Sequence, residues 1–267
     1  MGIGWEEFEL SHGKEISMND INTSPQSGEG GRSKPFLRRV IGVFTEPGEV
    51  FEDIARKPDF IGPLVLLILV SVAVTETMLS KIGMQRIIYA SIAQSRQASS
   101  LSPAQINQAI ERGAAIASVF AHLSALFGVP IFLAAMAGIG LIVLNGIFGV
   151  HAGFKKVFSV VCYADLPSVL AGVMAIAVML FGDPDHFNPQ SPVPSNPGFF
   201  LNPRETSRAV LALASSFDIF VLWFMILLAI GLSRVSGGAV KSRPIFFIYF
   251  GLWMILVVAK AGFALFT

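Results

Sequence analysis

The sequence predicts an all-α, polytopic membrane protein with five transmembrane helices. Of 267 residues, 53% are hydrophobic and only 14% are charged, against about 25% charged in an average soluble domain. Five apolar runs are each near or above the ~20 residues that span hydrocarbon. These runs lack the alternation of a β-barrel, and helices satisfy their own backbone hydrogen bonds in lipid. The runs are residues 60–80, 117–149, 158–181, 209–232 and 244–266.

Composition and motifs exclude several other classes of protein. The net charge of +1 offers no clustered basic face for nucleic acid. Cys162 is the single cysteine, so a disulfide or a cysteine-based zinc site is excluded. His122 has no second histidine at metal-binding spacing and is expected to be an interfacial hydrogen-bonding residue. No metalloprotease, serine-hydrolase or phosphate-loop motif occurs, so we predict no enzyme activity, no metal and no cofactor.

The amino-terminal segment, residues 1–34, is rich in Ser, Gly, Asn and charge and has no periodic apolar stripe. Such composition cannot bury a core, and we expect a disordered cytoplasmic tail. The segment also lacks the basic start and apolar run of a secretory signal. The first span is therefore expected to act as an uncleaved insertion signal.

Residues 35–59 are expected to form two short amphipathic helices. Apolar residues recur at helical spacing from Phe36 to Phe44, opposite Arg38 and Arg39. Pro47 fits the first turn of the second helix, which ends near residue 58. Both helices are expected to lie in the membrane interface, with their basic residues near lipid headgroups. The alternative is that they pack beneath the bundle as a cytoplasmic cap, and the pattern does not choose between the two.

Residues 60–267 form the expected transmembrane domain. At 1.5 Å per residue, its second apolar run is longer than the bilayer is thick, so part of it must project or bend. Pro130 is the expected kink, because it removes a backbone donor and clashes with the preceding turn.

Two connections outside the membrane have distinct signatures. Ser102 and Gln105 form a capping box around Pro103, which predicts a helix over residues 103–113 that leads into the second span. Residues 182–203 contain six prolines, which forbid a helix or a central strand. We expect this segment to be an extended cover or linker.

Most Lys and Arg residues fall on one side of the predicted spans, before the first span and in the second and fourth connections. The positive-inside rule therefore places the N-terminus in the cytoplasm and the C-terminus outside. The basic residues on the cytoplasmic side are Lys14, Arg32, Lys34, Arg38, Arg39, Arg56, Lys57, Lys155, Lys156, Arg234, Lys241 and Arg243.

Three stretches of the chain carry a resemblance to a known family: the spacing of Pro47, Phe51, Ile54 and Pro63, the sequence YADLP from Tyr163 to Pro167, and SFDIFVLW from Ser216 to Trp223. They resemble the Yip1 domain family, and its bacterial branch more than its Golgi branch. The likeness covers about residues 36–266. The family has five spans and a cytosolic N-terminus, which agrees with the topology predicted from charge.

The resemblance implies a role in membrane organisation. Eukaryotic relatives serve vesicle transport and bind small Rab-type GTPases, whereas many bacterial relatives resemble accessory proteins of membrane transport systems. The bacterial likeness implies location in a bacterial cytoplasmic (inner) membrane. Only about 35 residues precede the first amphipathic helix, in place of the long acidic region of eukaryotic members. GTPase binding is therefore not carried over to this chain.

Ionisable side chains within a membrane are costly and are candidate functional groups. Counting 1.5 Å per residue places Glu76, Asp218 and Lys260 in one layer on the outer side of the midplane. Lys260 would form a buried ion pair with Asp218 or Glu76. Such a layer is either an interhelical clamp or a proton or substrate relay, or else Glu76 and Lys260 extend to solvent.

A second polar face is predicted on the cytoplasmic side, around Asp165. Pro167 breaks the helix there, and Asn145 in the second span is expected to meet this face. The arrangement is either a cytoplasm-facing polar pocket or a local cap in which Asp165 serves the Pro167 kink. The residues that share the helix face with Asp165 are Cys162, Ser168 and Gly172.

Small residues in three spans predict places of close helix contact, because small side chains let backbones approach. The same pattern serves packing between helices of one chain or between copies of the chain. The sequence therefore does not decide whether the protein forms a homo-oligomer. These residues are Ala134, Gly138, Gly140, Ala229, Gly231, Ala259, Ala261 and Gly262.

Two functions follow from these features. The first is a non-enzymatic membrane protein that organises or assists membrane transport or trafficking through contacts with the lipid bilayer and with transport-system proteins. The second is a small transporter, channel or lipid-moving protein that uses the layer of Glu76, Asp218 and Lys260. A hydrated cavity that reaches this layer would favour the second.

Overall fold

The computed structural model describes residues 34–93, 102–183, 187–188, 191–202 and 205–265. All of them belong to the compact unit Lys34–Thr267. The expected tail, residues 1–34, lies outside the described residues except for Lys34. Within the described residues the chain forms helices and no strand, which confirms the predicted all-α class.

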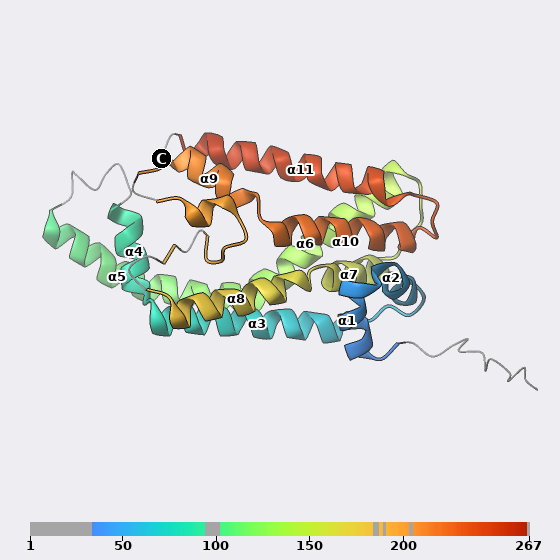
Figure 1. Cartoon of the computed structure of the whole chain (residues 1–267), viewed down its shortest axis with the longest axis horizontal. Coiled ribbons are helices and arrows are strands. Elements are labelled where there is room, and N and C mark those ends of the chain that lie inside the picture. The colour runs from blue at the N-terminus through green and yellow to red at the C-terminus, as the bar shows by residue number, and fades with distance from the viewer. Residues whose placement is uncertain (1–33, 94–101, 184–186, 189–190, 203–204, 266–267) are drawn as a thin grey trace, which may run out of the picture. The chain divides into compact units, whose positions relative to one another are not determined.

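Eleven α-helices follow one another along the described chain (Figure 1). They are α1 (Phe36–Thr45), α2 (Pro47–Arg56), α3 (Ile61–Lys81), α4 (Met84–Ala93), α5 (Pro103–Leu123), α6 (Val129–Leu141), α7 (Phe154–Ala164), α8 (Pro167–Phe181), α9 (Arg208–Ser216), α10 (Ile219–Val235) and α11 (Ser242–Phe263). Two π-helical segments, η2 (Ser124–Gly128) and η3 (Ile142–Ile147), and one 3-10 helix, η5 (Pro197–Phe200), complete the described elements.

Within the described residues, four helices are long and apolar enough to cross a membrane by length and composition. They are α3, the continuous helix over residues 103–147, the segment over 154–181, and α11. The pair of α9 and α10 passes the same test together, with a bend of 43° at the break between them. This pair is the fifth candidate span, and the polytopic class that the apolar runs predicted is confirmed.

The second span is one helix of 45 residues that begins at the predicted capping box. The Ser102 hydroxyl accepts from the Gln105 N–H at 3.3 Å, and the Gln105 side chain accepts from the Ser102 N–H at 2.8 Å. The irregularity expected at Pro130 takes the form of η2, which lies directly before it. A wider π turn accommodates the carbonyl that the proline cannot bond.

Helices from distant parts of the sequence pack closely at glycines. α3 packs along α8, where a Cβ on Gly172 would collide with a side chain of α3. Gly140 of α6 faces Val157 and Tyr249, and a Cβ there would lie 2.9 and 3.1 Å from them. The Tyr249 hydroxyl also donates to the Met136 carbonyl at 3.0 Å, which ties α11 to α6.

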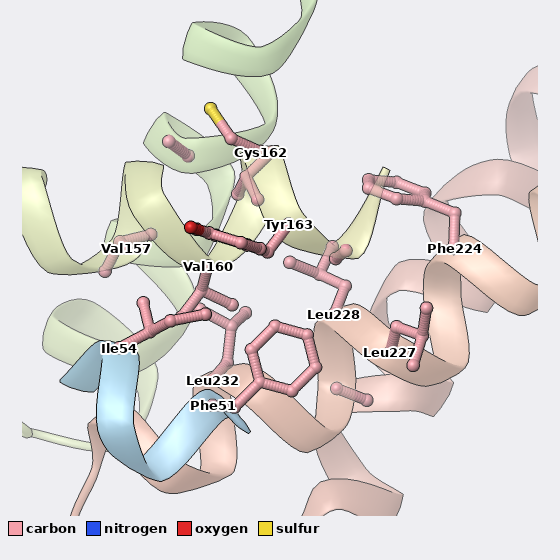
Figure 2. Close-up of a cluster of buried hydrophobic side chains, with 14 of the residues drawn as sticks. Phe51, Ile54, Val157, Val160, Cys162, Tyr163, Phe224, Leu227, Leu228 and Leu232 are labelled. Atoms are coloured by element: carbon pink, nitrogen blue, oxygen red, sulfur yellow. The ribbon is translucent and has the colours of Figure 1, made fainter. Parts of the chain in front are cut away.

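Helix α2 buries its apolar face in the main core of the protein. Val50, Phe51 and Ile54 are fully buried against α7 and α10. Figure 2 shows Phe51 pointing toward the side chains of α10, with Tyr163 above it. A Cβ on Gly231 would meet the Phe51 ring at 2.9 Å, so this glycine lets α2 approach α10. α2 therefore packs directly on the bundle.

The chain reverses after the first span through a helix that the sequence did not predict. Gly83 has a φ of +84°, a left-handed conformation that favours glycine, and it joins α3 to α4. α4 then packs on α5, where Ile88 lies against Gly113.

The bundle has two different ends (Figure 1). Helices α1 and α2 form a helical hairpin at one end, the hairpin end. The opposite end, the far end, carries α4, α9 and the described part of the proline-rich segment, residues 182–203.

Candidate functional site

Two membrane-spanning segments are broken, and each break contains an aspartate from one of the two longer motifs. Asp165 of YADLP lies between α7 and α8, and Asp218 of SFDIFVLW lies between α9 and α10. A helix end leaves backbone N–H and C=O groups without an intrahelical partner. Inside a membrane these groups must be satisfied by side chains or by other segments of the protein.

Asp165 acts locally across the first break. Its Oδ2 accepts a hydrogen bond from the Ser168 hydroxyl at 3.2 Å, and its carbonyl accepts from the Ser168 N–H at 2.9 Å. Pro167 lies in the first turn of α8, where its missing N–H would have no helical partner anyway. Asp165 and Ser168 therefore bridge the break that Pro167 imposes.

The other residues of the predicted inner polar face have different surroundings. Cys162 is fully buried, and Gly172 faces α3. Asn145 bonds to its own connection: its Nδ2 donates to the Ala152 carbonyl at 3.1 Å, and its Oδ1 accepts from the Ala152 N–H at 2.8 Å. Asn145 thus closes the connection between the second and third spans, rather than meeting the polar face as expected.

Asp218 closes the second break and binds the proline-rich segment. Its Oδ1 accepts from the Phe220 N–H at 2.8 Å, which caps the start of α10. Its Oδ2 accepts from the Ser195 hydroxyl and, at 3.3 Å, from Nδ2 of Asn196. The Ser195 carbonyl accepts from the Ile219 N–H at 3.1 Å. Three hydrogen bonds therefore join the break to residues 195 and 196.

The proline-rich segment is held against α9 by further contacts. The hydroxyls of Ser191 and Ser215 lie 2.6 Å apart. Gly198 approaches Ser215 so closely that a Cβ would collide with it. Asn196 also accepts from the Phe199 N–H at 3.2 Å and so caps η5. The described residues 191–198 of the segment expected to be a cover are thus fixed to the fourth span.

The structure does not join Glu76, Asp218 and Lys260 into one cluster. Glu76 Oε1 lies 2.8 Å from His122 Nε2 on α5. Lys260 is exposed on α11, and no ion pair within the described part of the chain connects it to either carboxylate. Counting residues gives the depth of a side chain but not which helices adjoin. Glu76 is on α3, which packs against α8 and the second span, whereas Lys260 is on α11, which packs most against α9 and α10. Asp218 lies between α9 and α10, but its side chain binds Ser195 and Asn196.

Glu76 of α3 and His122 of α5 form a polar contact between two spans. His122 Nδ1 lies 2.7 Å from the Ser118 carbonyl, which can only accept, so Nδ1 is assigned the hydrogen. Nε2 faces the Glu76 carboxyl. The two side chains are 51% and 56% exposed. They form a contact between the first and second spans on the outside of the bundle.

The sequence did not predict a buried ion pair that joins α1 to α2. Arg39 is 3% exposed; its Nε donates to Asp53 Oδ2 at 2.9 Å, and its Nη2 donates to the Lys57 carbonyl at 3.2 Å. Tyr163, the first residue of YADLP, is fully buried, and its hydroxyl lies in the electrostatic field of Arg39 without a hydrogen-bond partner among the described residues. The helical pattern placed Arg38 and Arg39 together on a polar face. Only Arg38 is exposed, because the hairpin brings Asp53 opposite Arg39.

The opposite side of α2 presents charge. Glu49, Glu52 and Arg56 form this charged face, with side-chain exposures of 69, 46 and 73%. Glu52 pairs with Arg56 and lies 3.9 Å from Arg234 of α10. The hydrogen bond from the Lys34 ammonium, at 2.9 Å, holds the pKa of Glu49 below its ordinary value.

The hydrogen bonds and ion pairs at the helix breaks, between the first two spans and around α2 join segments of the chain to one another. Among the described residues, no three His, Cys, Asp or Glu side chains gather closely enough to hold a metal ion. A cavity of about 260 Å³ lies at the far end, and its described lining residues do not include Glu76, Asp218 or Lys260. The residues that line it include Ile82, Met179, Phe187, Ser191 and Phe199.

The fold and the two aspartate-containing helix breaks define a polytopic helical membrane protein with broken spans. The sequence pattern of the Yip1 domain matches residues 41–261. The chain therefore belongs to the Yip1 domain family, as the three matching stretches predicted. Membrane protein YknW of Bacillus subtilis (strain 168) is 27% identical over 226 residues, which cover 84% of this chain and 87% of YknW. No solved structure matches this chain.

Proposed function

We propose that this chain is a non-enzymatic Yip1-type membrane protein that organises or assists membrane transport through contacts with other membrane proteins. It would lie in a bacterial cytoplasmic membrane with α1 and α2 on the cytoplasmic side. Residues 35–59 would serve as the contact element and residues 60–267 as its transmembrane support. The charge distribution along the sequence and the bacterial relative support this placement.

One observation carries the proposal: the charged face of α2 is presented on a rigid support. Phe51 and Ile54 are fully buried in the bundle, while Glu49 and Arg56 point away from it. A charged surface that is already fixed loses little conformational entropy on binding. Complementary charges also favour encounter with a chosen partner and disfavour others.

Photo-crosslinking in living cells tests the proposal at a single position. A photoreactive amino acid at Arg56 is expected to yield a defined crosslinked membrane protein, which should also co-purify in mild detergent. Glu111, exposed on α5 away from α2, is the matched control and should give no such product. If position 56 gives no product, or both positions give the same products, contact through α2 is wrong.

The alternative is a transporter, channel or lipid-moving protein that uses Glu76, Asp218 and Lys260. Its basis was a shared layer, but these side chains lie in separate environments, and none lines the described part of the far-end cavity. Reconstitution in liposomes separates the two functions. We expect no flux of ions, solutes or lipids that depends on Asp218. Flux that falls in Asp218→Asn would establish the alternative.

A further inference from the structure

The helix α1 has an outward apolar face that no described part of the chain covers. Leu37 and Ile41 lie one turn apart and are 71% and 63% exposed. The opposite side of the same helix holds Arg39 and Val43, which are buried. α1 is therefore apolar on a side that points away from the bundle, whereas the outward side of α2 is charged.

The contacts of α1 place it alongside the bundle rather than beneath it. The Phe44 ring packs edge-on against Trp223 of α10, with ring centroids 5.4 Å apart. Arg234 lies near the end of α10, and Trp223 lies eleven residues before it. This separation is about 16 Å at the helical rise of 1.5 Å per residue. A side chain of α1 thus reaches α10 well inside the length of the span.

The outward face of α1 also adjoins a lipid-facing stripe. Phe36 lies against Gly62 in the first turn of α3, where a Cβ would be 2.6 Å from the Phe36 ring. Along α3, Ile61, Val65 and Leu69 recur once per turn and are exposed. In Figure 1, α1 lies beside the start of α3. The exposed side chains of α1 therefore extend the apolar surface by which the first span meets lipid.

We infer that α1 is inserted among the acyl chains of the adjoining lipid leaflet, with Leu37 and Ile41 in contact with lipid. The backbone groups in the middle of α1 bond within the helix, and its buried Arg39 is paired with Asp53. Arg38 is exposed on the same helix and extends toward headgroups. The two short helices therefore have different partners: α1 binds lipid, and α2 binds the bundle and presents charge. This inference does not depend on the proposed protein contacts of α2.

Spin labels in proteoliposomes test the inference directly. Cys162→Ala removes the single native cysteine, which is fully buried, and provides the background for Leu37→Cys and Ile41→Cys. Val65→Cys on α3 is the lipid-facing control, and Glu46→Cys, exposed at the start of α2, is the water-facing control. Collision rates with oxygen and with a water-soluble nickel complex report whether each label lies in lipid or in water.

We expect labels at positions 37 and 41 to resemble position 65, with high oxygen and low nickel accessibility. Nickel accessibility equal to that of position 46 would mean that α1 faces water and would overturn the inference. Low accessibility to both reagents would mean that protein covers this face, which also overturns it. Each labelled variant must elute as one sharp peak in detergent, as the unlabelled Cys162→Ala protein does. Labels at both positions 37 and 41 guard against misfolding of one variant.

Discussion

The two ends of the bundle are stabilised by different interactions. At the hairpin end, α2, α7 and α10 bury a continuous set of large apolar side chains around one ion pair, Arg39–Asp53. At the far end, the buried apolar cluster is small, and the proline-rich segment is held by hydrogen bonds to Asp218 and Ser215. Apolar burial tolerates little change in shape, whereas hydrogen bonds can be exchanged for water. We therefore expect the hairpin end to determine global stability and the far end to open locally.

The largest effect is expected from Phe51→Ala. The ring is fully buried between α7 and α10, so its removal leaves a cavity and should lower the free energy of unfolding by about 3–5 kcal/mol. Titration with sodium dodecyl sulfate from mild detergent micelles measures this change. Phe181→Ala is the matched control, because Phe181 is 88% exposed, and should cost less than about 0.5 kcal/mol. Equal effects of the two variants would remove the distinction between the ends.

The second effect concerns the ion pair at the hairpin end. Asp53→Asn leaves the buried Arg39 guanidinium without its charged partner and should cost about 3 kcal/mol. The double variant Arg39→Met/Asp53→Leu removes both charges and should recover most of this loss. The same unfolding titration tests both proteins. A double variant no more stable than Asp53→Asn would mean that packing, rather than charge, dominates this contact.

A smaller and more local effect is expected at the far end. Asp218→Ala removes the cap of α10 and the acceptor for Ser195 and Asn196, at a cost of about 1–2 kcal/mol. Hydrogen exchange should rise in residues 191–202 before it rises in α2. Asp218→Asn retains an oxygen that can cap Phe220 and should lose less. Uniform acceleration of exchange in both regions would contradict local opening.

The smallest effect is expected where the first two spans meet. A double-mutant cycle of Glu76→Gln and His122→Gln should give a coupling energy of about 0.6 kcal/mol, the average for hydrogen bonds between membrane helices. Glu76→Gln combined with Lys260→Met is the control cycle and should give no coupling. Coupling in the control cycle, and none in the first, would restore the predicted polar layer and count against the observed pair.

The sequence predicted the breaks in the spans better than the partners of the residues within them. Pro167 and Pro130 are local signals, because a missing N–H disturbs a helix whatever surrounds it. The capping box at Ser102 was predicted for the same reason and is confirmed. The partners of Glu76 and Asp218 depend on which helices adjoin, and no local pattern encodes that. His122 was expected to be a hydrogen-bonding residue, but nothing in the sequence pointed to Glu76.

The amino-acid sequence by itself determined that this is a membrane protein, that it is helical, and to which family it belongs. Apolar runs, prolines and caps act over a few residues and can therefore be recognised in the sequence. Tertiary structure alone decided that Arg39 is buried while Arg38 is exposed, and that Glu76 meets His122 rather than Lys260. It also gave α1 and α2 different outward faces, apolar on α1 and charged on α2, although their amphipathic patterns are alike in the sequence. The physical reason is that burial and charge pairing depend on neighbours distant along the chain, which only the packed bundle brings together.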